Sequence, residues 1–214
     1  NSLAQFVFGF TESGRFGAAR QTKNSLVINM SWGVGLGMVL DDKIFRGHNG
    51  FAGEFSHISL FANGRLCACG KQGCLETEAS GWALTRMVKE KILEGSSSIL
   101  VEKMNGKGEI QMEDVIKAAN NDDVLAIELI AKIGDNIGRG IALLINIFNP
   151  ELVILGGSLA QTGEYIRLPI KSAINKYSLS LVNNDTQLKL SQLGKRAGII
   201  GACLLVRKRL LSLS

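Results

Sequence analysis

The first clear pattern along the chain is a pair of short apolar runs separated by a glycine-rich turn. Leu26 to Ile28 forms one run, and Gly35 to Leu40 forms the next. This arrangement predicts a strand, a tight turn and a second strand that ends at Asp41 and Asp42. A further short extended segment begins at Ile44 and Phe45.

Helical spacing of apolar residues dominates the second half of the chain. It predicts a helix from Trp82 to Leu93, a shorter one from Glu113 to Asn120 and a long one from Asp122 to Phe148. Pro150 stops the long helix, because proline cannot continue the helical hydrogen bonds.

Strand and helix patterns continue to alternate towards the end of the sequence. A buried strand is predicted from Leu152 to Leu155, then a helix from Glu164 to Tyr177 and a strand from Gln187 to Leu190. A very apolar helix is predicted from Ala197 to Leu211. With no internal repeat and no linker, the pattern predicts a single α/β domain over residues 1–214.

The apolar residues of segment 47–75 recur with neither helical nor strand spacing. This segment is rich in glycine, cysteine and small polar residues. A long irregular segment inside a compact domain is usually functional or held by a metal ion. We therefore expect this segment to carry chemistry.

Composition narrows the class of protein. The 214 residues are 46% hydrophobic and 20% charged, which excludes an intrinsically disordered chain. No apolar run is long enough for a membrane span, and the first residues lack the order of a secretory signal. We therefore expect a cytoplasmic protein. The net charge of +5 is modest, and we interpret the cluster Arg207 to Arg209 as a solvated helix end rather than a nucleic-acid patch.

The strongest chemical signal is one histidine and three cysteines in the irregular segment: His57, Cys67, Cys69 and Cys74. Three thiolates and one imidazole are a standard tetrahedral set for structural zinc, with no open position for a catalytic water. A disulfide is the alternative, although a cytoplasmic location disfavours it. Free buried cysteines are a further alternative, which fits Cys203 in its apolar surroundings better than Cys67.

The same segment resembles the signature of the ROK family. The sequence GHNGFAGEFSHI is followed by CACGKQGCLE, and the resemblance extends through FGAAR at 16–20, the glycine turn at 33–37 and LGG at 155–157. That family contains bacterial sugar kinases and related sugar-responsive transcriptional repressors. The resemblance implies the C-terminal half of an actin-like, ribonuclease H-like sugar kinase fold with a zinc-stapled loop. It also implies a homodimer.

The resemblance places Glu54, His57 and Glu76 in a sugar pocket, together with Asn1. Carboxylates suit this role because they accept hydrogen bonds from vicinal sugar hydroxyls. A histidine bound to zinc through one ring nitrogen keeps the other nitrogen free for a ligand. Without the resemblance, both glutamates would be interpreted as ordinary surface carboxylates.

The chain departs from the kinases of the family in parts that catalysis needs. It has no Asp-x-Gly-x-Thr phosphate loop, and aligning Gly9 with the family pattern places Ser2 where the catalytic aspartate belongs. A serine hydroxyl cannot act as the general base that activates a sugar hydroxyl. We therefore expect no catalytic residue in this chain.

The nucleotide site also looks degenerate. Trp32 lies in the turn where the family has a phosphate-contacting Gly-Thr-Gly, and its indole should obstruct nucleotide phosphates. A vestigial site would retain only glycines: Gly33, Gly35, Gly156 and Gly157. Phosphoryl transfer needs positioned phosphates and a base, so we do not expect ATP as a cofactor.

Together these observations predict the sugar-sensing effector domain of a ROK transcriptional regulator. The N-terminal kinase-like half and any winged helix-turn-helix are expected to be missing, so DNA would be contacted only through that missing module. One alternative is a fragment of an ATP-dependent sugar kinase. Another is a dimerising structural remnant, in which the apolar stretches 141–148 and 197–206 serve a subunit interface.

Overall fold

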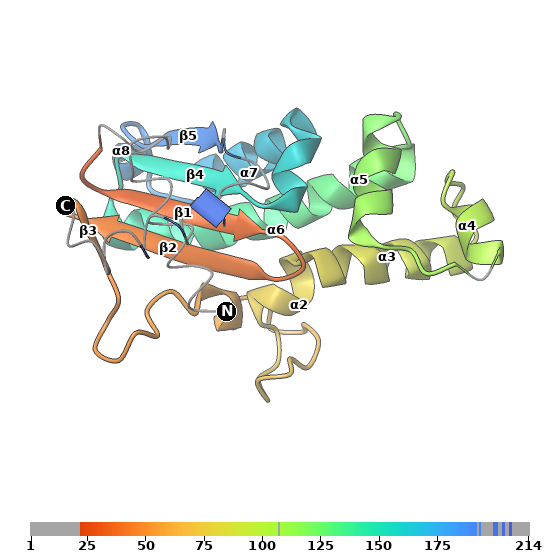
Figure 1. The fold of residues 1–214 in the computed structure, drawn as a ribbon, viewed down its shortest axis with the longest axis horizontal. Coiled ribbons are helices and arrows are strands. Elements are labelled where there is room, and N and C mark those ends of the chain that lie inside the picture. The colour runs from red at the N-terminus through yellow and green to blue at the C-terminus, as the bar shows by residue number, and fades with distance from the viewer. Residues whose placement is uncertain are drawn as a thin grey trace.

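A computed structural model describes residues 22–106 and 108–191, together with residues 193, 199, 200, 203 and 206. Among these residues, five strands form one mixed sheet in the order β3-β2-β1-β4-β5. Figure 1 shows helices α6 and α7 behind the sheet, while α3, α4 and α5 extend to the right of it. The α/β class predicted from the sequence is confirmed.

The sheet contains both antiparallel and parallel pairs. β1 and β2 form an antiparallel hairpin, and β3 pairs with β2. β4 lies parallel to β1 on the other side, and β5 lies parallel to β4. The carboxyl ends of β1 and β4 therefore meet at one edge of the sheet. The strands are β1 (Ser25–Met30), β2 (Val34–Leu40), β3 (Lys43–Ile44), β4 (Leu152–Gly156) and β5 (Gln187–Leu190).

The helices follow the predicted order. The longer ones are α3 (Gly81–Leu93), α5 (Met112–Asn120), α6 (Val124–Phe148) and α7 (Glu164–Tyr177). Three short helices were not predicted: α2 (Leu75–Ala79), α4 (Val101–Asn105) and α8 (Ser180–Asn183). Single 3-10 turns complete the set: η1 (Phe55–His57) and η2 (Ser158–Thr162).

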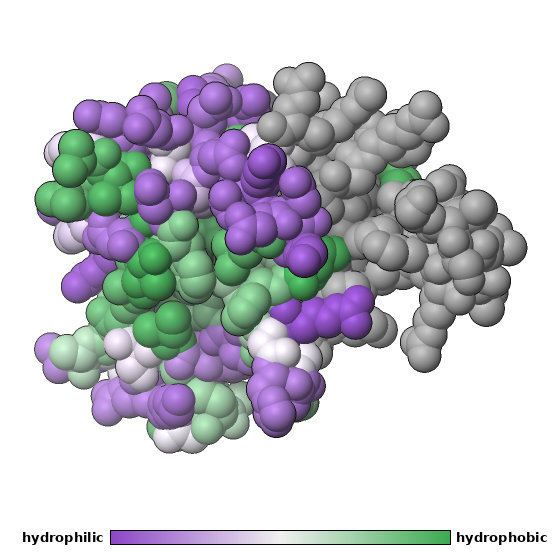
Figure 2. All heavy atoms as spheres, turned by 90° about the vertical axis from the view of Figure 1, so that its left-hand side faces the viewer, coloured by the Kyte–Doolittle hydropathy of each residue, from purple (hydrophilic) through white to green (hydrophobic). Residues whose placement is uncertain are grey.

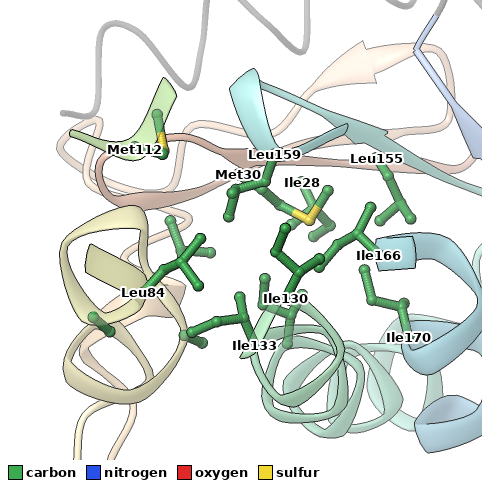
Figure 3. Close-up of a cluster of buried hydrophobic side chains, with 14 of the residues drawn as sticks. Ile28, Met30, Leu84, Met112, Ile130, Ile133, Leu155, Leu159, Ile166 and Ile170 are labelled. Atoms are coloured by element: carbon green, nitrogen blue, oxygen red, sulfur yellow. The ribbon is translucent and has the colours of Figure 1, made fainter. Parts of the chain in front are cut away.

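Helix α6 organises the core between the sheet and α7. Figure 3 shows Ile130 and Ile133 of α6 among side chains from β1, β4, α3 and α7. Close contact with α7 depends on glycine, because a Cβ at Gly138 would lie 2.6 Å from the Ile170 carbonyl oxygen. The helix ends at Phe148, before Pro150, with Asn149 in the left-handed conformation.

The surface of the described part of the chain carries some exposed apolar side chains. No helix among the described residues is long and apolar enough to cross a membrane. On the face shown in Figure 2, hydrophobic residues gather between hydrophilic ones. The exposed apolar side chains of α8 and of the adjoining end of α6 include Leu181 and Ile147.

The final predicted helix lies mostly outside the described residues. Residues 199, 200, 203 and 206 are helical, as expected. Cys203 is exposed, so the expectation that it is a small buried apolar residue is wrong. The cluster Arg207 to Arg209 lies outside the described part of the chain, as do residues 1–21.

Candidate metal centre and adjoining carboxylates

The irregular segment folds back on itself through one tight backbone crossing. The backbone amides of Leu60 and Phe61 both donate to the Gly73 carbonyl oxygen, at 2.9 and 3.1 Å. Gly73 has a φ of +73°, and a Cβ there would lie 1.8 Å from the Phe61 carbonyl oxygen. Only glycine fits this position, which brings the first half of the segment against the cysteines.

The four predicted metal ligands come together. Their ligand atoms all lie within 4.8 Å of one another. The Cys67 sulfur lies 3.6 Å from His57 Nδ1, and the sulfurs of Cys69 and Cys74 are also 3.6 Å apart. A tetrahedral zinc ion with Zn–S bonds of about 2.3 Å requires ligand separations of roughly 3.6–3.8 Å. The donor set and these two separations therefore fit a structural zinc ion.

The environments of the cysteines differ. Burial raises the pKa of the Cys74 thiol to about 12, and hydrogen bonds with Cys69 and Cys67 act in the same direction. A backbone hydrogen bond from Lys71 lowers the pKa of the exposed Cys69 thiol. Cys74 would therefore remain protonated without a cation, and a metal ion that binds there must displace its proton.

His57 connects the cysteine cluster with Glu54. Its Nδ1 faces Cys67, while its Nε2 lies 3.9 Å from Glu54 Oε2. The side chains of His57 and Glu54 are 33% and 38% exposed, so a ligand can reach both. One ring nitrogen of His57 thus faces the cysteine cluster, and the other, which was predicted to be available to a ligand, lies near the Glu54 carboxylate.

Phe55 anchors this pair to the core, a role that the sequence motifs did not reveal. Phe55 directly follows Glu54 and precedes His57 by two residues, and its side chain is only 2% exposed. Its ring packs on α6 so closely that a Cβ at Gly140 would lie 2.7 Å from Phe55 Cζ. The signal available in the sequence was a large apolar residue directly after Glu54, in a segment rich in glycine and small polar residues.

Glu76 lies against the turn between β1 and β2. It belongs to the first turn of α2, two residues after the ligand Cys74. Its Oε2 accepts a hydrogen bond from the Val34 backbone amide at 3.1 Å, and a Cβ at Gly33 would lie 2.7 Å from Oε1. The predicted sugar residue Glu76 and the predicted nucleotide-site glycine Gly33 are therefore direct neighbours.

The predicted nucleotide-site glycines gather around the end of β1. Asn29 pairs with Gly35 on one side and with Gly156 on the other. Gly157 has a φ of +89°, and a Cβ there would lie 2.4 Å from the Met30 carbonyl oxygen. The adjacent Trp32 is 54% exposed. Asn1 and Ser2 lie outside the described residues, so their predicted places in the site stay predictions.

The chain is similar in sequence to proteins of two kinds, glucokinases and transcriptional regulators. The chain is 36% identical to a glucokinase of Halalkalibacterium halodurans, over 90% of this chain and 59% of that protein. It is 32% identical to the DNA-binding transcriptional dual regulator NagC of Escherichia coli, over 92% of this chain and 47% of that protein. The chain thus spans about half the length of that regulator.

The solved structures that resemble this chain are also of both kinds. A ROK family transcriptional regulator, a homolog of the E. coli MLC protein, matches with a TM-score of 0.86 and 35% identity, over 94% of this chain and 50% of that one. A ROK family glucokinase from Streptomyces griseus, in complex with glucose and AMPPNP, matches with a TM-score of 0.86 and 31% identity, over 96% of this chain and 67% of that one. The ROK family sequence profile matches residues 11–209, and the chain belongs to the ROK family.

Proposed function

We propose that this chain is the sugar-sensing effector domain of a ROK transcriptional regulator and lacks kinase activity. Glu54, His57 and Glu76 bind the hydroxyls of a sugar in this proposal. A structural zinc ion bound by His57 and the three cysteines of the loop holds these side chains in place. Catalysis is not assigned to any residue of the chain.

The observation that carries this proposal is the indole at position 32. Trp32 lies in the turn after β1, next to Ser31, whose hydroxyl accepts a hydrogen bond from the Ser158 amide at the edge where the carboxyl ends of β1 and β4 meet. Ligands of open α/β sheets bind at such an edge. A half-exposed indole in the turn that the family uses for phosphate contact leaves little room for a nucleotide. Sugar contacts do not require this turn, so sugar binding can persist without ATP.

Support for a sugar effector also comes from the relatives. Proteins at 32% identity include N-acetylglucosamine repressors and a xylose repressor of Caldicellulosiruptor bescii. We therefore propose a hexose, a pentose or one of their derivatives as the effector. In this proposal the protein acts as a cytoplasmic homodimer, and a separate winged helix-turn-helix module contacts DNA.

A sugar kinase is the second candidate. It is favoured by the 36% identity to the Halalkalibacterium halodurans glucokinase, which exceeds the identity to the repressors. For a kinase, Trp32 would have to move aside when ATP binds, and the general base would have to come from another residue than Ser2.

The gene upstream of the Asn1 codon distinguishes the two candidates. A regulator requires a winged helix-turn-helix followed by a kinase-like half without the Asp-x-Gly-x-Thr loop. An intact phosphate loop with no DNA-binding module would overturn the proposal and favour the kinase.

A further inference from the structure

One cation on α6, Arg139, lies over two aromatic rings from distant parts of the chain. The Arg139 guanidinium carbon lies 5.4 Å from the ring centre of Phe61, which belongs to the irregular segment 47–75, called the metal loop below. It also lies 5.4 Å from the ring centre of Tyr177, at the end of α7. Stacking on rings covers the faces of a guanidinium but leaves the N–H groups at its edge free to donate.

Those N–H groups are not used inside the described part of the chain. Within it, no carboxylate oxygen lies within 4.0 Å of Arg139, and none of its nitrogens donates a hydrogen bond. By contrast, Arg167 forms two hydrogen bonds of 2.7 Å with the Glu164 carboxylate. The donors of Arg139 are therefore available to a ligand that accepts two parallel hydrogen bonds.

Arg139 borders a hollow of about 600 Å³ beside the metal loop. Loop residues 60–64 line the hollow, together with residues of α6, Met87 and Tyr177. Asn136 also lines the hollow and is 5% exposed, and its Nδ2 donates to the Glu78 carbonyl oxygen at 2.7 Å. The hollow thus places apolar side chains, a buried amide and a cation around one space, and a few convergent polar groups of this kind can orient a small ligand.

Charges around the hollow favour an anion. The Glu78 carboxylate already accepts the Arg65 backbone amide at 3.0 Å and lies 4.0 Å from the Arg86 guanidinium. Among the other lining residues described, Asp135 is the remaining carboxylate, and it lies within about one turn of the cations Lys132 and Arg139 on the same helix.

A third cation lies close by. Lys176 Nζ is 5.0 Å from the ring centre of Tyr177. Lys132, Arg139 and Lys176 outnumber the single unengaged carboxylate of Asp135, so the local field attracts negative charge.

We propose that this hollow binds an oxyanion, either a carboxylate or a phosphate group of a small molecule, with Arg139 as the bidentate donor. The proposal does not depend on the proposed sugar function, since none of Glu54, His57 and Glu76 lines the hollow. It predicts that anion binding affects the predicted zinc ligands, because the Phe61 ring lies 5.4 Å from the Arg139 guanidinium carbon and the Phe61 amide donates to the carbonyl oxygen of Gly73, next to Cys74.

The test follows the Arg139 side chain directly. The Nε–H signals of the arginines are recorded by nitrogen-15 NMR while inorganic phosphate is added, and in a separate series acetate, at constant ionic strength. We expect a saturable shift of the Arg139 signal and none for Arg167, whose donors are occupied. Saturation with phosphate alone identifies a phosphate site, and saturation with acetate as well identifies a general carboxylate and phosphate site.

Two variants separate binding from folding. R139K keeps the charge but loses the planar fork, so we expect affinity for the saturating anion, followed in both proteins through the Asn136 side-chain amide signal, to fall by about tenfold or more while the melting temperature changes little. K171Q, on the outer side of α7, is the matched control and should bind as the parent does. A shift of Arg139 no larger than that of Arg167, or unchanged affinity in R139K, would overturn the proposal.

Discussion

The substitution Gly33→Ala tests whether Glu76 acts in sugar binding without touching the glutamate itself. Gly33 does not have a positive φ, so its backbone conformation is open to alanine. The new Cβ would lie 2.7 Å from Glu76 Oε1, whereas ordinary contact begins at 3.4 Å. The carboxylate must therefore retreat by about 0.7 Å.

This displacement has a calculable effect on stability. The Val34 amide donates to the other oxygen of the same carboxylate, Oε2, at 3.1 Å, and a retreat of the whole carboxylate away from β2 by the same distance takes this pair beyond hydrogen-bonding distance. A hydrogen bond to a charged acceptor contributes about 1.5–3 kcal/mol, and alanine returns about 0.4–1 kcal/mol by restricting the unfolded chain. We expect a net loss of about 1–2 kcal/mol, or a melting temperature lower by roughly 2–8 °C.

Sugar affinity should respond more strongly than stability. Loss of one charge-assisted hydrogen bond to a sugar hydroxyl lowers affinity by about 10- to 100-fold. The assay is calorimetric titration of the intact protein that carries this chain with glucose, N-acetylglucosamine and xylose. Gly106→Ala is the matched control, because its new Cβ comes no closer than 3.5 Å to another atom and lies far along the chain from the site.

The Val34 amide signal in NMR separates the two steps of this reasoning. If that signal does not move in the Gly33→Ala protein, the carboxylate has not been displaced and the steric argument is wrong. If the signal moves but sugar affinity stays within about twofold of the parent, Glu76 is not a sugar ligand. Either result refutes the reasoning.

Three further predictions concern the metal, the core and pH. Cys69→Ser should lower both the zinc content measured by mass spectrometry and the melting temperature, whereas equal stability of metal-free and metal-loaded protein would contradict a structural role. Gly140→Ala should shift the urea midpoint downwards, because overpacking against Phe55 costs about 1–3 kcal/mol and better helix propensity returns about 1 kcal/mol. Asp114→Asn should cost about 0.5–2 kcal/mol at neutral pH, since Asp114 completes the capping box of α5. Burial alone would raise the pKa of Asp114, but hydrogen bonds from Lys103 and the Gln111 amide lower it below its ordinary 3.8, so this stabilisation is present above about pH 4 and disappears as pH falls further. A difference between parent and Asp114→Asn that did not shrink in acid denaturation curves would exclude this explanation.

The helices that were predicted from sequence are long enough for the spacing of their apolar residues to repeat. Helix α6 has 25 residues, enough for its apolar stripe to be seen, and the hairpin of β1 and β2 carries its own turn. By contrast, α2, α4 and α8 have only four or five residues, too few to show helical spacing. The prediction failed for Cys203 because apolar neighbours in sequence do not determine which side of a helix faces solvent.

In the candidate site too, local features could be predicted from the sequence, whereas contacts between distant segments could not. The ligands His57, Cys67, Cys69 and Cys74 lie within one segment, so their residue types and spacing are enough to indicate a metal. The contact between Glu76 and Gly33 joins residues 43 positions apart, and the stacking of Arg139 joins three segments. Such contacts depend on tertiary packing, which has no local signature in a single sequence.

The measurement that most directly tests the central claim combines sugar binding with ATP turnover in the intact protein. Binding of each sugar is measured by calorimetry, and phosphorylation of the same sugar is followed through ADP release under identical conditions. The account predicts that one sugar binds and that no ADP is released above background. Sugar-dependent release of ADP at a rate typical of kinases would contradict it. The Trp32 side chain would then have to move away from the turn between β1 and β2 when ATP binds.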